Sequence, residues 1–157
     1  MRKRSAGVLM YKYEAGDLRV LLLHPGGPFW KDRDEGAWSI PKGEFEESEE
    51  PLSAARREFT EELGSEPTGE FCPLGEVRQR SGKVVTAFAM RGDFDPDKLR
   101  SSEFEIEWPP KSGLRQSFPE VDRAQWFDLA DARRKILPAQ AEFLDRLSEL
   151  VRAGERD

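Results

Sequence analysis

The sequence is poor in the residues that build disulfide frameworks and zinc sites. It has 157 residues, with one cysteine, Cys72, and one histidine, His24. A single cysteine excludes an intrachain disulfide, so a reducing cytoplasm is the expected compartment. A single histidine leaves no histidine-rich zinc site.

Long apolar runs and an excess of basic residues are also missing. The apolar run at residues 7–10 is too short for a signal-peptide core or a membrane span, so we expect no membrane association. The formal net charge of −6 argues against an extended nucleic-acid surface. It does not exclude phosphate-rich substrates, because divalent cations can hold such groups.

The length predicts a single domain over residues 1–157. Strand-like runs occupy residues 6–13, 18–24, 74–80, 83–92, 103–108 and 124–129, and helical patterns occupy 51–63, 130–136 and 138–154. We expect the polar segments 93–102 and 109–123 to be loops. Because strands and helices do not strictly alternate, the pattern predicts an α/β or α+β sandwich.

Residues 51–63 combine an apolar stripe with a crowded acidic face. The stripe consists of Leu52, Ala55, Phe59 and Leu63. At about 100° per residue, Glu58, Glu61 and Glu62 fall within one arc beside it. Two interpretations fit the helix alone. The glutamates form a solvated face, or a cation belongs among them.

The wider spacing favours the cation. Residues 43–65, GEFEESEEPLSAARREFTEELGS, contain Gly43, Glu49 five residues later, and Arg57-Glu58 after seven more. This pattern resembles the Nudix box, G-x5-E-x7-R-E-U-x-E-E-x-G-U, at seven single-residue positions. Chance agreement at that many positions is expected on the order of once in 10^8 windows.

The resemblance implies a fold and a chemistry. Nudix proteins are α/β/α sandwiches with a mixed sheet, and the enzymes hydrolyse a nucleoside diphosphate linked to a further group with Mg²⁺ or Mn²⁺. It also implies metal ligands, namely the carboxylates of Glu58, Glu61 and Glu62 and the carbonyl oxygen of Gly43. Arg57 would then orient the carboxylates, and Glu49 would brace the junction of loop and helix.

The general base has two possible sources in the resembled family, a glutamate of the box or one in a later segment. Glu103, Glu105 and Glu107 alternate along a predicted strand and so share one face. We expect Glu103 to be the base, because it begins the strand next to a polar loop. The alternative is that all three lie on an exposed strand face.

The substrate is less defined. Lys42, in the sequence PKG at the head of the box, resembles the dinucleoside-polyphosphate branch and is expected to contact a phosphate, although no tyrosine follows the box. Trp30, Trp38 and other aromatic residues are candidates for stacking on a base. We therefore expect a small-molecule substrate, either a nucleoside triphosphate or a dinucleoside polyphosphate. The alternatives are a nucleotide sensor that does not cleave, a hydrolase of RNA 5′ ends, and a hydrolase of inositol pyrophosphates.

The helix at 138–154 is expected to pack on the core, and a homodimer through it is an alternative.

Overall fold

The computed structural model describes residues 3–156. Its strands are β1 (Arg4–Glu14), β2 (Asp17–Pro25), β3 (Lys42–Glu44), β4 (Phe71–Arg78), β5 (Val84–Arg91), β6 (Glu103–Glu107), β7 (Arg115–Pro119) and β8 (Val121–Asp128). Its helices are α1 (Pro51–Leu63), α2 (Leu129–Lys135) and α3 (Ala141–Arg156), with short 3₁₀ turns at Pro96–Lys98 and Pro138–Gln140. No helix in the described part of the chain is long and apolar enough to cross a membrane.

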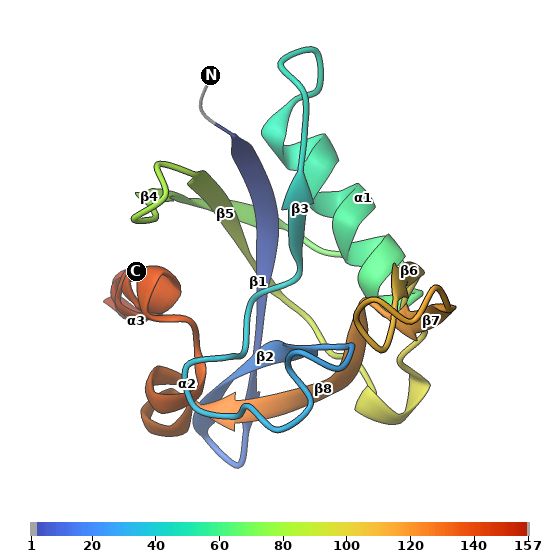
Figure 1. Ribbon diagram of the computed structural model, residues 1–157. Helices are drawn as coiled ribbons and strands as arrows, with labels where there is room; N and C mark the ends of the chain where they lie inside the picture. Colours follow the sequence, from blue (N-terminus) through green and yellow to red (C-terminus); the bar gives the residue numbers. More distant parts are fainter. Residues whose placement is uncertain (1–2, 157) are drawn as a thin grey trace.

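The main sheet is mixed. Its strands follow the order β4-β5-β1-β2-β8, and β3 adds to β1 (Figure 1). The β1–β5 pair is parallel, and the other pairs are antiparallel. Helix α1 covers one face, and α2 and α3 lie on the other side. The expected α/β/α sandwich with a mixed sheet is therefore confirmed.

The core has two layers because the central strands are buried on both faces. On β1, Val8 and Met10 pack in the layer beneath α1, whereas Leu9 packs in the layer shared with α3. Three apolar residues of α3, namely Phe143, Leu144 and Leu147, are fully buried in that second layer. The expectation that this helix packs on the core of its own chain is therefore confirmed.

Helix α1 begins and ends where the sequence predicts. Pro51 occupies its first turn, and Gly64 ends it in the left-handed conformation at φ 80°. Phe59 and Leu63 are buried against the sheet, chiefly on β1. The acidic residues of the same helix are thereby held at the edge of the sheet, beside β3.

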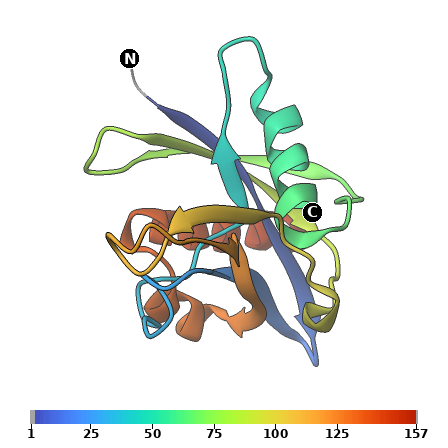
Figure 2. The same cartoon turned by 45° about the vertical axis from the view of Figure 1, so that its right-hand side comes forward.

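One predicted loop was wrong in part. Residues 109–123 contain β7, which pairs with β6 in a separate two-stranded sheet, and the start of β8 (Figure 2). All but one of the side chains of β7 are exposed, so no alternation of apolar and polar residues marks it in the sequence. Its pairing with β6 makes it a strand. On β6, Glu103, Glu105 and Glu107 are exposed and share one face, as predicted.

Candidate functional site

Arg57 connects three carboxylates of the Nudix-like segment. Its Nε and Nη2 atoms each donate to Glu49 at 3.0 Å, forming a two-pronged contact between α1 and the loop before it. Its Nη1 atom donates to Glu58 at 2.8 Å and to Glu61 at 3.4 Å. The bonds to Glu49 and then Glu58 raise the pKa of Arg57. The predicted roles of Arg57 and Glu49 fit this geometry.

Gly43 makes room for Glu58. A Cβ atom placed on Gly43 would lie 1.9 Å from the carboxyl carbon of Glu58. No side chain larger than hydrogen fits there unless Glu58 moves. The first glycine of the segment therefore lets β3 approach the acidic edge of α1, although Gly43 and Glu58 lie fifteen residues apart.

Glu62 lies on the inner side of the same edge. Its Oε2 atom accepts a hydrogen bond of 3.1 Å from the backbone N–H of Lys42 on β3. Burial, followed by the charge of Glu58, raises the pKa of Glu62 to about 8. Burial also raises the pKa of Glu58 and lowers that of Lys42. Charge on these carboxylates is therefore costly unless a positive partner is present.

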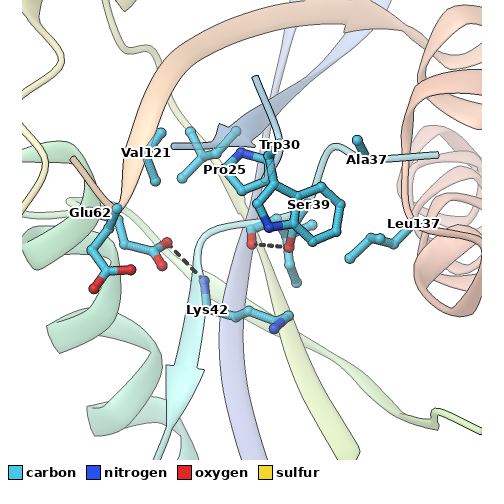
Figure 3. A pocket seen from close by; sticks show the side chains of 11 residues that line it. Pro25, Trp30, Ala37, Ser39, Lys42, Glu62, Val121 and Leu137 are labelled. Carbon is cyan, nitrogen blue, oxygen red and sulfur yellow. Dashed lines mark hydrogen bonds between the residues drawn. The ribbon is translucent and has the colours of Figure 1, made fainter. Parts of the chain in front are cut away.

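Glu62 and Lys42 line a cavity of about 240 Å³ between β3, β8 and the loop after β2 (Figure 3). The indole of Trp30 lies across this cavity, and the side chain of Lys42 extends beneath it. Apolar side chains complete the wall, namely Leu23, Pro25, Ala37, Ile40, Val121 and Leu137. An apolar wall with an aromatic ring and a few charged groups is typical of a small-molecule site.

Two residues that the sequence predicted to contact the substrate do not line this cavity. Glu103 is exposed and is not among the residues that line the cavity. The residue before it, Ser102, donates its backbone N–H to the carbonyl oxygen of Glu61 at 3.0 Å. This bond places the start of β6 beside the C-terminal end of α1. Trp38 is buried and does not line this cavity.

Glu120 was not predicted from the sequence as a residue of the site. This exposed residue lines the cavity, and its charge contributes to the raised pKa of Glu62. It lies between β7 and β8, in the segment predicted to be a loop, and nothing in its neighbourhood resembles a motif. Only the tertiary structure brings Glu120 to Glu62.

Comparison with known proteins agrees with the geometry. The NUDIX domain profile matches residues 1–147. The chain belongs to the NUDIX domain family. Curated Nudix relatives named RNA pyrophosphohydrolase include one from Helicobacter pylori (strain G27), 30% identical over 109 residues, and one from Bartonella henselae, 35% identical over 66 residues. The first match spans 66% of each chain, just under two thirds, and the second spans 40% of this chain and 35% of the relative. The name RNA pyrophosphohydrolase describes what those relatives do, and it supports the hydrolase activity proposed below.

Solved Nudix structures share the fold. An Ap4A hydrolase from C. elegans in a binary complex has a TM-score of 0.67 and 22% identity, and covers 95% of this chain and 98% of that one. The NUDIX domain of Shewanella oneidensis NrtR, complexed with ADP ribose, has a TM-score of 0.65 and 18% identity, with 96% and 89% covered. At these identities the likeness concerns the fold.

The acidic edge of this Nudix protein suits a divalent cation, but it is not closed around one. No three carboxylate, imidazole or thiol groups between residues 3 and 156 are gathered as a ready-made metal site. Glu58 and Glu61 face Arg57, and Glu62 faces the N–H of Lys42. The raised pKa values of Glu58 and Glu62 nevertheless mark neighbouring carboxylates whose charges a cation would stabilise. Hard oxygen donors of this kind are those that Mg²⁺ and Mn²⁺ prefer.

Proposed function

We propose that this protein hydrolyses a pyrophosphate linkage in a nucleoside-diphosphate derivative, with Mg²⁺ or Mn²⁺ bound. The supporting observation is the position of the arginine-linked carboxylates beside a cavity that contains Glu62, Lys42 and Trp30. The first substrate class is a nucleoside triphosphate or a dinucleoside polyphosphate. A cytoplasmic location and a homodimer stay predictions.

Glu58, Glu61 and Glu62 would hold the metal, together with the carbonyl oxygen of Gly43. When bound, the ion neutralises pyrophosphate charge and acidifies a water molecule. Arg57 keeps Glu58 and Glu61 on the same side of α1, because its guanidinium donates to both. Since Arg57 is also fixed on Glu49, the carboxylates stay in place as a substrate arrives.

Lys42 and Trp30 would bind the nucleotide. Lys42 lines the cavity, where a phosphate would offset the cost that burial imposes on its positive charge. The indole of Trp30 offers a flat apolar face in the same cavity for a base. Trp30 sets a stacking position without selecting among bases, because every base has such a face.

Two glutamates are candidates for the general base. Glu103 remains the sequence-based prediction, and it begins β6 directly after the contact of Ser102 with Glu61. Glu120 is the second candidate, because it lines the cavity that contains Glu62. A base must reach the attacking water within hydrogen-bond distance, directly or through one further water molecule.

Removal of pyrophosphate from RNA 5′ ends is a second candidate function. The H. pylori and B. henselae relatives carry the name RNA pyrophosphohydrolase, and they match at 30% and 35% identity. A triphosphorylated 5′ nucleotide presents the same base, sugar and phosphate groups as a free nucleoside triphosphate. Inositol pyrophosphates fit less well, because Lys42 is the one cationic side chain among the described residues that line the cavity, alongside two glutamates.

Product analysis tests the proposal. The protein is incubated with Mg²⁺ and, separately, with nucleoside triphosphates, dinucleoside polyphosphates, nucleotide sugars, inositol pyrophosphates and a 5′-triphosphorylated RNA. Glu62→Gln serves as the control for contaminating activity. We expect one nucleotide class to be cleaved by the wild type and spared by Glu62→Gln. Nucleotide and metal binding without turnover of any substrate would instead indicate a sensor.

A further inference from the structure

A second cavity, of about 330 Å³, is lined by more positive than negative side chains. The loop after β2 contributes to both cavities: Trp30 lines the first, and residues 31–34 line the second. The other side of the second cavity is one face of β8, because Arg123, Gln125 and Phe127 alternate along that strand. The remaining lining residues are Trp38 and Lys135.

The charge of this cavity departs from that of the whole chain. Four cationic side chains line it, namely Lys31, Arg33, Arg123 and Lys135, against two acidic ones, Asp32 and Asp34. The protein as a whole carries a net charge of −6. A local excess of cations in an acidic protein is a feature that an anionic ligand would explain.

Two of these four cations lack a carboxylate partner among the described residues, and a third has only a long contact. Among the described residues, Lys31 and Arg33 form no ion pair within 4.0 Å, and the Nε atom of Arg123 approaches Asp122 only at 3.9 Å. The Oδ1 atom of Asp122 is already bonded to the Nδ1 atom of buried His24 at 2.7 Å. The guanidinium groups of Arg33 and Arg123 therefore keep free N–H donors.

Aromatic rings hold the two guanidinium groups in place. Arg33 lies over Trp30 with 5.6 Å between the guanidinium carbon and the ring centroid, and Arg123 lies over Trp38 at 5.1 Å. Stacking of this kind orients a guanidinium while its edge stays open to a ligand. Since Trp30 also lines the first cavity, Arg33 lies next to the proposed base-stacking position.

Hydrogen bonds from two directions fix the loop that contains Arg33. The Nε2 atom of His24 lies 2.6 Å from the carbonyl oxygen of Arg33. Asp34 accepts a hydrogen bond of 2.9 Å from the indole N–H of Trp38 and another from Lys135, whose bond is the leading cause of the lowered pKa of Asp34. The cationic side chains that line the second cavity therefore come mainly from a hydrogen-bonded loop and from strand β8.

We propose that this second cavity is a phosphate-binding site, distinct from the first cavity, that accepts phosphate groups of an extended or a free ligand. Arg33 and Arg123 supply paired N–H donors, whose planar fork matches phosphate oxygens, and Lys31 adds a mobile charge at the rim. The site goes beyond the proposed activity, because binding there needs no hydrolytic step. Two sources offer this chemistry, namely the backbone of an oligonucleotide that continues out of the first cavity and a free polyphosphate.

Direct binding measurements test the site apart from catalysis. The first probe is a hexanucleotide RNA with a 5′-hydroxyl group and a 3′ fluorophore, followed by anisotropy from low to high salt in EDTA. The second probe is inorganic tripolyphosphate, followed by calorimetry. The test variant is Arg33→Gln with Arg123→Gln. The matched control is Arg80→Gln with Arg152→Gln, which removes the same charge from exposed positions elsewhere.

The expected result is loss of affinity by about tenfold or more in the test variant, with affinity within twofold of the wild type in the control. For the hexanucleotide, the slope of log affinity against log salt should decrease by about 1 to 1.5 when two phosphate contacts are lost. Loss confined to the hexanucleotide identifies an oligonucleotide backbone as the ligand. Loss that includes tripolyphosphate identifies a site that also takes free polyphosphate.

Equal affinities of the test and control variants for both probes would overturn the proposal, and so would the absence of millimolar binding of either probe to the wild type. Lys31→Gln, at an exposed position, gives a second variant if the double substitution impairs folding. These results are independent of the proposed function. If the wild type cleaves no substrate, but the test variant binds the probes more weakly than the wild type, the phosphate site is supported and the proposed hydrolase activity is wrong.

Discussion

The guanidinium of Arg57 and the carboxylate of Glu49 make a pair of hydrogen bonds, Nε to Oε2 and Nη2 to Oε1, each 3.0 Å long. The pair links the loop after β3 to the second turn of α1. The Nη1 atom remains free to bind Glu58 and Glu61. One side chain therefore anchors the loop and arranges the proposed metal ligands.

Arg57→Lys should impair catalysis more than folding. Lysine keeps the charge but cannot make the paired contact with Glu49 while it holds two other carboxylates. We expect Mg²⁺ affinity or kcat to fall by about 10–100-fold, with a small change in Tm because the contact is exposed. Arg56→Lys, at the exposed neighbouring position, is the matched control. Equal kinetics of the two variants would remove the positioning role.

Gly43→Ala should displace Glu58. The new methyl group would lie 1.9 Å from the carboxyl carbon of Glu58, so either that side chain or β3 must move. We expect a fall in Mg²⁺ affinity of about 10–100-fold, measured by calorimetry. Gly154→Ala in α3 is the control, because nothing lies within 4 Å of its added Cβ. Unchanged metal affinity in Gly43→Ala would mean that Glu58 does not bind the ion.

Glu103→Gln and Glu120→Gln distinguish the two candidates for the general base. Loss of the base should lower kcat by about 10²–10⁴-fold, while metal affinity is kept. The variant that combines a large fall in kcat with unchanged metal affinity identifies the base. If both variants keep the wild-type kcat, the base belongs to the Nudix box itself.

Trp30→Ala should weaken substrate binding. Loss of a base–aromatic stack costs about 1–3 kcal/mol, so KM for a cleaved nucleotide should rise at least about fivefold while kcat changes less. Trp30→Phe should restore most of the affinity, because it keeps an aromatic face. A KM that is equal in the wild type and Trp30→Ala would exclude Trp30 as the stacking position.

Protons and metal should compete at Glu62. Its pKa is raised from 4.5 to about 8, so between these values the folded chain binds a proton that the unfolded chain does not. The free energy of unfolding of the metal-free protein should therefore fall as pH rises through this range, by at most about 1.4 kcal/mol per pH unit. Urea unfolding in EDTA from pH 5 to 8 measures this slope.

Glu62→Gln is the matched control for that experiment, because it removes the titrating group and should flatten the slope. Adding Mg²⁺ at pH 8 should restore stability to the wild type and much less to Glu62→Gln. Identical slopes in the two proteins would show that Glu62 ionises as an ordinary carboxyl group.

Much of the helix and its chemistry could be predicted from local spacing. Pro51 and Gly64 bound α1 in the structure as they do in the sequence. Glu58, Glu61 and Glu62 share one side of the helix because residues three and four apart are neighbours on its surface. Helical periodicity depends on the chain itself, so no distant contact was needed to place these groups together.

Strand β7 and Glu120 could not be predicted in this way. A strand that is exposed along nearly its whole length carries no apolar alternation, and it is recognised only by its pairing with β6. Glu120 lines the same cavity as Glu62 because it connects that hairpin to β8. Neither feature has a local signal in the sequence.

The sequence by itself determined the family-like motif, the layered fold and the acidic face of α1, because spacing and periodicity act along the chain. The tertiary structure alone decided which charges are costly and where a substrate can lie. The raised pKa of Glu62 depends on burial beneath distant segments, and the cavity joins Trp30, Lys42 and Glu120 from three separate parts of the chain. Burial and electrostatic environment are sums over the folded molecule, so they have no counterpart in any short stretch of sequence.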